Sequence, residues 1–212
     1  METTQDEKET GRIEAFSDGV FSIAITLLVL EFKPPRLYEL ESATYLAKAL
    51  FQQWPSYLAY FISFFTILIM WVNHHRIFAY IKRIDNVFLF LNGFLLMLVA
   101  FVPFPTQVLA GHIQHRYAVT ATAFYTGTYV LIALAFNALW HYAIYKRRLL
   151  SRAATVACVN QITKSYMFGP PLFFLTFVLA FFNVVVSLLA FTALAFFYAL
   201  TGEIKPSQKS QS

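Results

Sequence analysis

Charged side chains are scarce in this sequence, and cysteine is nearly absent. Asp, Glu, Lys and Arg make up 13% of the 212 residues, whereas 58% are hydrophobic and 18% are aromatic. So small a charged fraction cannot cover a surface that faces water, which excludes a soluble globular protein and predicts lipid as the surrounding solvent. Cys158 is the only cysteine, so an intrachain disulfide is also excluded.

Motifs that would assign other functions are missing. The chain has no paired histidine boxes, no His-Glu-x-x-His and no Gly-x-Ser-x-Gly, so an enzyme is not expected. Its seven glycines form no Thr-Val-Gly-Tyr-Gly loop, which excludes a carbonyl-lined filter of high potassium selectivity. No basic patch alternates with stacking aromatic residues, so nucleic acid is not an expected partner. Adjacent His74 and His75 point about 100° apart on a helix, and we expect no metal site and no cofactor.

Six apolar segments approach the length of a membrane span, about 20 residues. They predict an all-α integral membrane protein with six transmembrane helices, at residues 13–32, 55–78, 87–109, 119–145, 166–182 and 184–200. We extend the fifth helix back toward Ala157 and place a tight turn at Asn183, because residues 172–200 are too many for one upright helix. Residues 38–54 are expected to form an amphipathic helix that leads into the second span at the outer surface.

The distribution of cationic residues predicts which way the spans face, since Lys and Arg are retained on the cytoplasmic side of a membrane. With both termini cytoplasmic, twelve Lys and Arg residues fall on that side and four on the other. The four outer residues are Lys33, Arg36, Lys48 and Arg116. The sequence therefore predicts a multi-pass protein with a flexible cytoplasmic N-terminus (1–11), a transmembrane domain (12–201) and a flexible cytoplasmic tail (202–212).

Asp18 is a carboxylate inside the first apolar segment. It lies roughly 7–8 Å along the helix from the start of that segment, and a carboxylate at that depth needs a partner. We hypothesise that Ser17 and Asp18 hydrogen-bond to polar residues at the cytoplasmic end of the second span. The candidates are Asn73, His74 and His75.

Two alternative interpretations of Asp18 stay open. Its carboxylate could reach water at the membrane edge or cap the start of the helix. Alternatively, Asp18 and His74 could form the proton relay of a secondary transporter or proton-coupled carrier.

Ile23, Leu27 and Leu30 form an apolar stripe after this polar segment. At 100° per residue the three side chains fall within about 60° of one another on a helix. Such a stripe is also typical of a helix that faces lipid or packs against a neighbour. Repeated by symmetry around an axis, however, it would form a hydrophobic constriction that dewets when narrow and passes partly dehydrated ions when wider.

The polar segment and the stripe together resemble the first-helix signature of the transmembrane protein 175 family. The matching run is Arg12, three further residues, Phe16-Ser17-Asp18, and then the apolar residues 19–31. That family comprises potassium-permeable channels of endosomes and lysosomes, with bacterial relatives. The resemblance implies a potassium-permeable cation channel with modest preference for potassium over sodium, in the inner membrane of a bacterial cell.

The resemblance also implies an assembly and residue roles. It implies a homotetramer in the lipid bilayer, with the first helix of each subunit lining a central pore for potassium ions. Ile23 would form the narrowest ring, and Leu27 and Leu30 would form further apolar rings. The motif that holds this helix in place would be Arg12, Phe16, Ser17 and Asp18. Its partners on the second helix would be Trp71 and His74, with Asn73 and His75 as alternatives.

Overall fold

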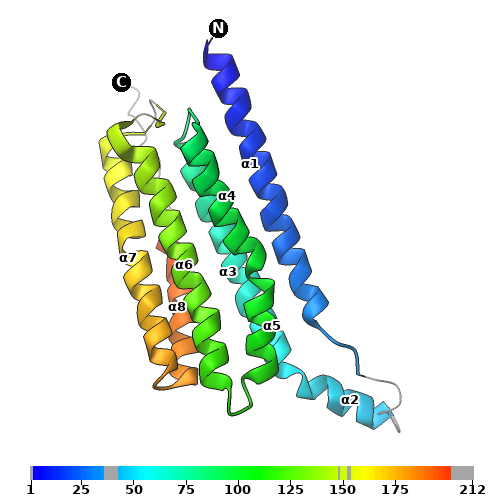
Figure 1. Cartoon of the computed structure of the whole chain (residues 1–212). Helices are drawn as coiled ribbons and strands as arrows, with labels where there is room; N and C mark the ends of the chain where they lie inside the picture. Colours follow the sequence, from blue (N-terminus) through cyan, green and yellow to red (C-terminus); the bar gives the residue numbers. More distant parts are fainter. Residues whose placement is uncertain (1, 36–42, 148, 152–153, 202–212) are drawn as a thin grey trace, which may run out of the picture.

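The computed structural model describes residues 2–35, 43–147, 149–151 and 154–201, and its long elements are all helices. Successive long helices run antiparallel (Figure 1). Those that lead away from the end carrying Glu2 are α1 (Glu2–Leu27), α4 (Asn86–Phe101) with α5 (Pro103–His112), and α7 (Val156–Ala180). Those that return are α3 (Trp54–Ala79), α6 (Ala118–Ile144) and α8 (Val184–Thr201). The short elements are η1 (Leu28–Glu31), α2 (Ala43–Gln52) and η3 (Tyr145–Arg147).

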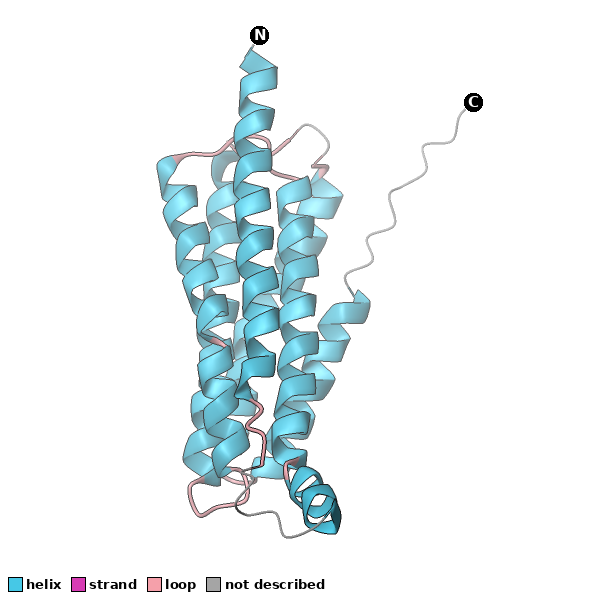
Figure 2. Ribbon diagram, turned by 90° about the vertical axis from the view of Figure 1, so that its right-hand side faces the viewer, coloured by secondary structure: helices cyan, strands magenta, loops and turns pink. Residues whose placement is uncertain are grey.

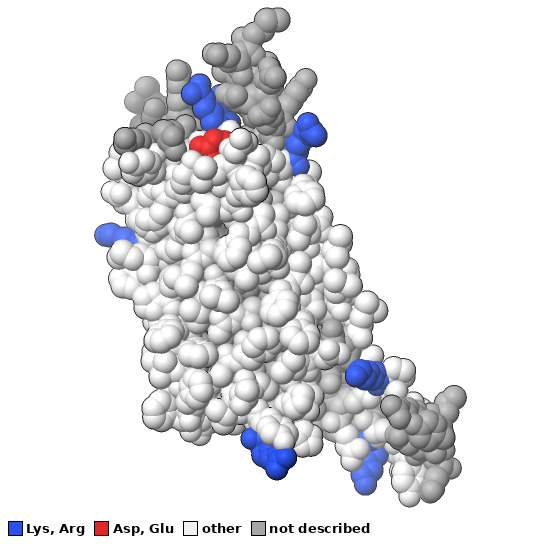
Figure 3. Space-filling view, viewed as in Figure 1, with Lys and Arg blue, Asp and Glu red and all other residues white. Residues whose placement is uncertain are grey.

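Five helical segments are long and apolar enough to cross a membrane: Thr10–Leu30, Trp54–Ala79, Asn86–His112, Ala118–Ile144 and Val156–Ala180. The sixth, α8, is apolar but has only 18 residues, which rise about 27 Å against a hydrocarbon layer about 30 Å thick. In Figure 3, most Lys and Arg side chains lie near the two ends of the molecule, and the middle is almost bare of charge. The prediction of an all-α membrane protein is therefore confirmed, with five clear spans and one shorter apolar helix.

The third predicted span is divided into two helices. The side chain of Asp85 caps α4 by accepting a hydrogen bond from the backbone N–H of Phe88 at 2.9 Å, as expected of an N-cap aspartate. The helix then breaks at Val102, because Pro103 and Pro105 follow and a proline lacks the N–H that a continuing helix needs. The span predicted over residues 87–109 is therefore confirmed as one crossing, Asn86–His112, but its helix is interrupted at Val102.

The predicted extension of the fifth helix is confirmed. Helix α7 begins at Val156, and the side chain of Thr155 caps it by accepting from the N–H of Cys158 at 3.3 Å. Pro170 lies inside this continuous helix. The predicted turn at Asn183 is also confirmed, because its Oδ1 accepts from the N–H groups of the first turn of α8 at 2.9 and 3.1 Å.

Flexible segments were predicted at both ends of the chain, and the structure describes only the first of them. Residues 2–11, expected as a flexible segment, continue the helix α1. Residues 202–212 lie outside the described part of the chain. Helix α2 occupies residues 43–52 of the predicted amphipathic segment 38–54, whose first five residues also lie outside the described part.

The interior contains a cluster of hydroxyl groups that joins three helices. Ser63 of α3 hydrogen-bonds to Thr106 of α5 at 2.8 Å and to Tyr125 of α6 at 2.9 Å, and all three side chains are buried. Lipid offers no hydrogen-bond partners, so polar groups within a bundle must pair with one another. This cluster fixes α5 against α3 and α6, while α1 packs on the edge of the bundle against α3 and α4.

Candidate functional site: the first helix and its polar contacts

One side of α1 is buried against the rest of the subunit. Ser17, Phe21, Ala24 and Leu28 recur every three or four residues and are 0–1% exposed. This spacing is that of one face of a helix. Because α1 packs against α3 and α4, and its Ser17 and Phe21 contact Asn92 of α4 and His74 of α3, the rotation of α1 about its own axis is fixed.

A second side of α1, about 120° round the helix from the buried one, carries large apolar side chains that the subunit leaves exposed. The exposed fraction is 66% for Phe16, 60% for Ile23, 39% for Leu27 and 71% for Leu30. Figure 2, viewed from the α1 side of the bundle, shows no other helix of the described chain covering α1. The structure therefore brings the three residues of the apolar stripe onto one exposed face, which is an interaction surface for lipid or for another chain.

The stripe does not follow α-helical geometry throughout. Leu28 to Glu31 form the 3₁₀ helix η1, which has three residues per turn instead of 3.6. Leu30 therefore lies above Leu27 more directly than the α-helical wheel predicts, because side chains three residues apart eclipse in a 3₁₀ helix.

A buried chain of hydrogen bonds joins α1 to α3 through α4. Asn92 donates through Nδ2 to Ser17 Oγ at 3.0 Å, and its Oδ1 lies 2.9 Å from His74 Nε2. Ser17 Oγ itself donates to the backbone carbonyl of Ile13 at 2.8 Å. Since Asn92 Oδ1 can only accept, His74 must donate from Nε2.

Two phenylalanine rings lie close to the ring of His74. The ring lies between those of Phe78, with centroids 4.4 Å apart, and Phe21, at 5.3 Å. In the described structure its Nδ1 is buried without a hydrogen-bond partner. The network therefore orients His74 through one nitrogen only, and that bond is directed to α4 and not to α1.

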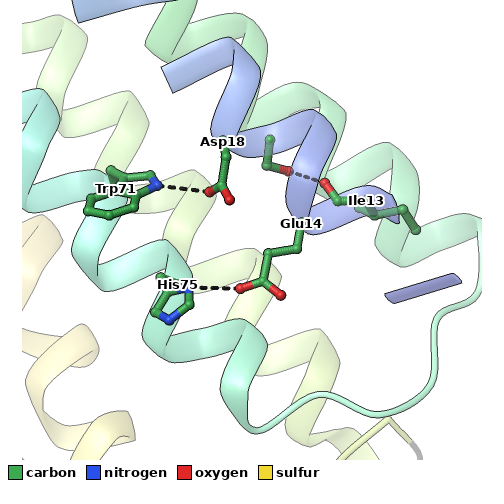
Figure 4. A network of polar contacts seen from close by, with 6 residues as sticks. Ile13, Glu14, Asp18, Trp71 and His75 are labelled. Atoms are coloured by element: carbon green, nitrogen blue, oxygen red, sulfur yellow. Dashed lines mark hydrogen bonds and ion pairs between the residues drawn. The ribbon is translucent and has the colours of Figure 1, made fainter. Parts of the chain in front are cut away.

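Two further contacts join α1 directly to α3 (Figure 4). The indole N–H of Trp71 donates to Asp18 Oδ1 at 2.8 Å, and His75 Nδ1 lies 2.8 Å from Glu14 Oε1. Glu14 and Asp18 are one turn apart on α1, just as Trp71 and His75 are one turn apart on α3. Because the helices are antiparallel, the two residues of each helix face the two residues of the other.

The expected partners of Ser17 and Asp18 differ from those observed. Neither side chain bonds directly to a histidine: Ser17 reaches His74 only through Asn92, and Asp18 bonds to Trp71. The side chain of Asn73 instead accepts from Arg76 at 3.2 Å. The resemblance had indicated Trp71 and His74 on the second helix, and both contact α1: Trp71 by its hydrogen bond to Asp18, and His74 by its ring contact with Phe21.

The sequence reasoning missed Asn92 and Glu14. Asn92 interrupts the apolar run that follows Asn86 at the start of α4, which was the available signal. Glu14 precedes Asp18 by one helical turn, so its carboxylate shares the face of α1 toward α3. The remaining motif residues, Arg12 and Phe16, are exposed on α1.

Comparisons with known proteins identify several relatives. The family model described as the endosomal/lysosomal potassium channel TMEM175 matches residues 12–103. A protein of Chamaesiphon minutus named a potassium channel is 49% identical over 200 residues, which cover 94% of this chain and 98% of that protein. A Streptomyces collinus protein, also named a potassium channel, is 40% identical over 203 residues, covering 95% of this chain and 97% of that protein.

A solved structure has the same fold. It is the crystal structure of a lysosomal potassium-selective channel TMEM175 homolog from Chamaesiphon minutus, with a TM-score of 0.84 and 48% sequence identity. The match covers 92% of this chain and 100% of that one. The likeness therefore extends over nearly the whole molecule, including α1 and the helices that hold it.

Proposed function

This chain belongs to the TMEM175 family, and on that basis we propose that it forms a potassium-permeable cation channel as a homotetramer. In this proposal four copies of α1 surround a central conduction pathway, and residues 12–201 form the channel domain of each subunit. The relatives are named as channels for potassium, and ion channels are not enzymes.

The observation that supports this proposal best is the division of α1 into two faces. Polar contacts hold one side to α3 and α4, while Ile23, Leu27 and Leu30 are exposed on the other. A pore helix needs this arrangement, because its lining residues must stay free of their own subunit while the helix keeps a fixed rotation. Symmetry would convert the stripe into apolar rings, with Ile23 as the constriction.

The expected selectivity follows from the chemistry of such rings. Methyl and methylene groups cannot replace the hydration shell of an ion as carbonyl oxygens do. Discrimination would then rest on the cost of partial dehydration and on the width of the constriction. We therefore propose modest selectivity for potassium over sodium.

We also propose that both termini are cytoplasmic, in the inner membrane of a bacterial cell. Among the described side chains, Arg12, Arg76, Lys82, Arg83, Arg147 and Lys164 lie on segments near the end that carries Glu2. Lys33, Lys48 and Arg116 lie on segments at the other end. This excess of cations is the pattern expected of a cytoplasmic side. Six crossings, with α8 as the sixth, would return the chain to that side.

The alternative function, a secondary transporter or proton-coupled carrier using Asp18 and His74, is not favoured. The two side chains bond to different residues, Asp18 to Trp71 and His74 to Asn92. Such a relay would need the two groups to exchange a proton, and the named relatives are channels.

The proposal is tested by replacing Ile23 in the purified protein reconstituted into planar bilayers. We expect unitary current steps from the wild type, and Ile23→Asn should move the potassium-to-sodium permeability ratio toward unity. The matched control is Leu131→Asn, at an exposed position of α6, which should leave the ratio unchanged. An unaltered ratio in Ile23→Asn, or saturable flux without unitary steps in the wild type, would contradict the proposal.

A further inference from the structure

Helix α2 differs from the long helices in its direction. Figures 1 and 2 show that it runs across the bundle axis, at the end of the molecule away from Glu2, and projects on the side of α1. Its ten residues form a rod about 15 Å long. A helix placed across the ends of membrane spans lies roughly parallel to the plane of the bilayer.

The depth of α2 follows from the length of α3. Helix α3 has 26 residues, which rise about 39 Å, whereas the hydrocarbon layer is about 30 Å thick. Its ends therefore extend beyond the hydrocarbon into the polar headgroup regions. Because α2 ends at Gln52 and α3 begins at Trp54, α2 lies at the depth of one of these regions.

The polar and aliphatic side chains of α2 lie on two faces, and the exposed Tyr45 and Phe51 lie at the edges of the polar one, each about 60° from Lys48. Thr44, Lys48 and Gln52 follow one another at four-residue intervals and fall within about 80° of one another. Leu46 and Leu50 point about 160° away from Lys48. All five side chains are exposed in the subunit, so both a polar and an apolar face are available to the surroundings.

We propose that α2 is an interfacial helix, with its apolar face in the acyl chains of phospholipids and its polar face in the aqueous headgroup layer. A helix of this kind, which lies in the plane of the interface, combines an apolar face with a basic or polar one. Tyr45 and Trp54, both exposed, are the residue types that concentrate at this depth of a bilayer. Lys48 lies on the polar face, where phosphate groups and water solvate it.

The corner between α2 and α3 is connected to the end of the first helix. Gln53 donates through Nε2 to the backbone carbonyl of Lys33 at 2.8 Å. The ring of Phe32 lies against those of Tyr57 and Tyr60, with centroid distances of 5.4 and 5.1 Å. Phe32 directly follows η1, which carries Leu30. A shift of α2 with the lipid surface is therefore transmitted to the apolar stripe, and this consequence for conduction rests on the proposed function.

The placement of α2 is tested by spin labels at single cysteines in proteoliposomes, on a Cys158→Ser background. Labels at Leu46→Cys and Leu50→Cys should relax faster with oxygen, which concentrates in lipid. Labels at Lys48→Cys and Gln52→Cys should relax faster with a water-soluble nickel chelate. Leu131→Cys, at an exposed position in the middle of the membrane-spanning α6, serves as the control for mid-membrane depth.

Two outcomes would overturn the placement. Strong relaxation by nickel at all four α2 sites would place the helix in water. Protection of the two leucine sites from both reagents would show that another protein chain covers them. Neither result depends on whether the protein conducts ions.

The transmission to α1 is tested by channel recordings in bilayers of short-chain and long-chain phosphatidylcholine. We expect the open probability of the wild type to differ several-fold between the two lipids, and Gln53→Ala to reduce that difference while leaving the spin-label pattern unchanged. Equal open probability of the wild type in both lipids, or an undiminished difference in Gln53→Ala, would refute the transmission. A complete lack of current would refute the proposed function and the transmission with it, but not the placement of α2.

Discussion

Replacing Asn92 by leucine is expected to destabilise the subunit through the loss of the link between α1 and α3. The substitution removes two hydrogen bonds of a side chain that is only 2% exposed. Ser17 keeps its bond to the carbonyl of Ile13, but His74 retains a buried Nε2–H without an acceptor. An orphaned donor of this kind costs about 1–3 kcal/mol. A central value of about 2 kcal/mol corresponds to a roughly 30-fold change in the unfolding equilibrium.

The assay is the fraction of folded protein as a function of the mole fraction of sodium dodecyl sulfate in mixed micelles. Asn160→Leu, at an exposed position of α7, is the matched control and should change the free energy of unfolding by less than about 0.5 kcal/mol. The double variant Asn92→Leu with His74→Phe leaves no orphaned donor, so it should cost less than the sum of the two single variants. Single effects that add to within about 0.5 kcal/mol would refute the idea of an energetically coupled network.

Three further predictions use the same unfolding assay. Asp18→Asn keeps an acceptor for Trp71 but removes the charge, so we expect a loss of about 1 kcal/mol; unchanged stability would show that the charge of this carboxylate does not matter. Asp85→Ala removes the cap of α4 and should cost about 1–2 kcal/mol, whereas a smaller effect than that of the Asn160 control would contradict the capping argument. An added Cβ meets nothing within 4 Å at Gly93 but an aromatic ring at 3.3 Å at Gly127. Gly93→Ala should thus leave the free energy of unfolding unchanged or raise it by up to about 1 kcal/mol, whereas Gly127→Ala should lower it. A Gly127→Ala variant more stable than Gly93→Ala would refute this interpretation of the packing.

The helices could be predicted from the sequence because lipid leaves the backbone few choices. A chain that crosses hydrocarbon must satisfy its N–H and C=O groups internally, so a long apolar run becomes a helix. The break at Val102 was missed because hydropathy measures the apolar character of the side chains and gives no information on backbone hydrogen bonds. Pro103 and Pro105 carried the signal for it, but a proline inside an apolar run can also be accommodated, as Pro170 is within α7.

From the residues alone the polar contacts of α1 were predictable in kind but not in partner, and it was the resemblance that indicated Trp71. The depth of Asp18 required a hydrogen bond from a neighbouring helix, and such a bond exists. Choosing Trp71 over His74 required the rotation of α3 about its axis, which a run of aromatic and apolar residues on all sides does not reveal. Asn92 was missed because its helix was considered only for its apolar length.

The 3₁₀ turn at the end of the first helix has a mechanical consequence. From Leu27 to Leu30 the chain turns about 360° and rises about 6 Å in this geometry, against about 300° and 4.5 Å in an α-helix. Conversion of these few residues between the two forms would swing the Leu30 side chain by about 60° and shift it by about 1.5 Å. Local rewinding of these residues could thus change the direction of the Leu30 side chain while the body of α1 stays packed against α3 and α4.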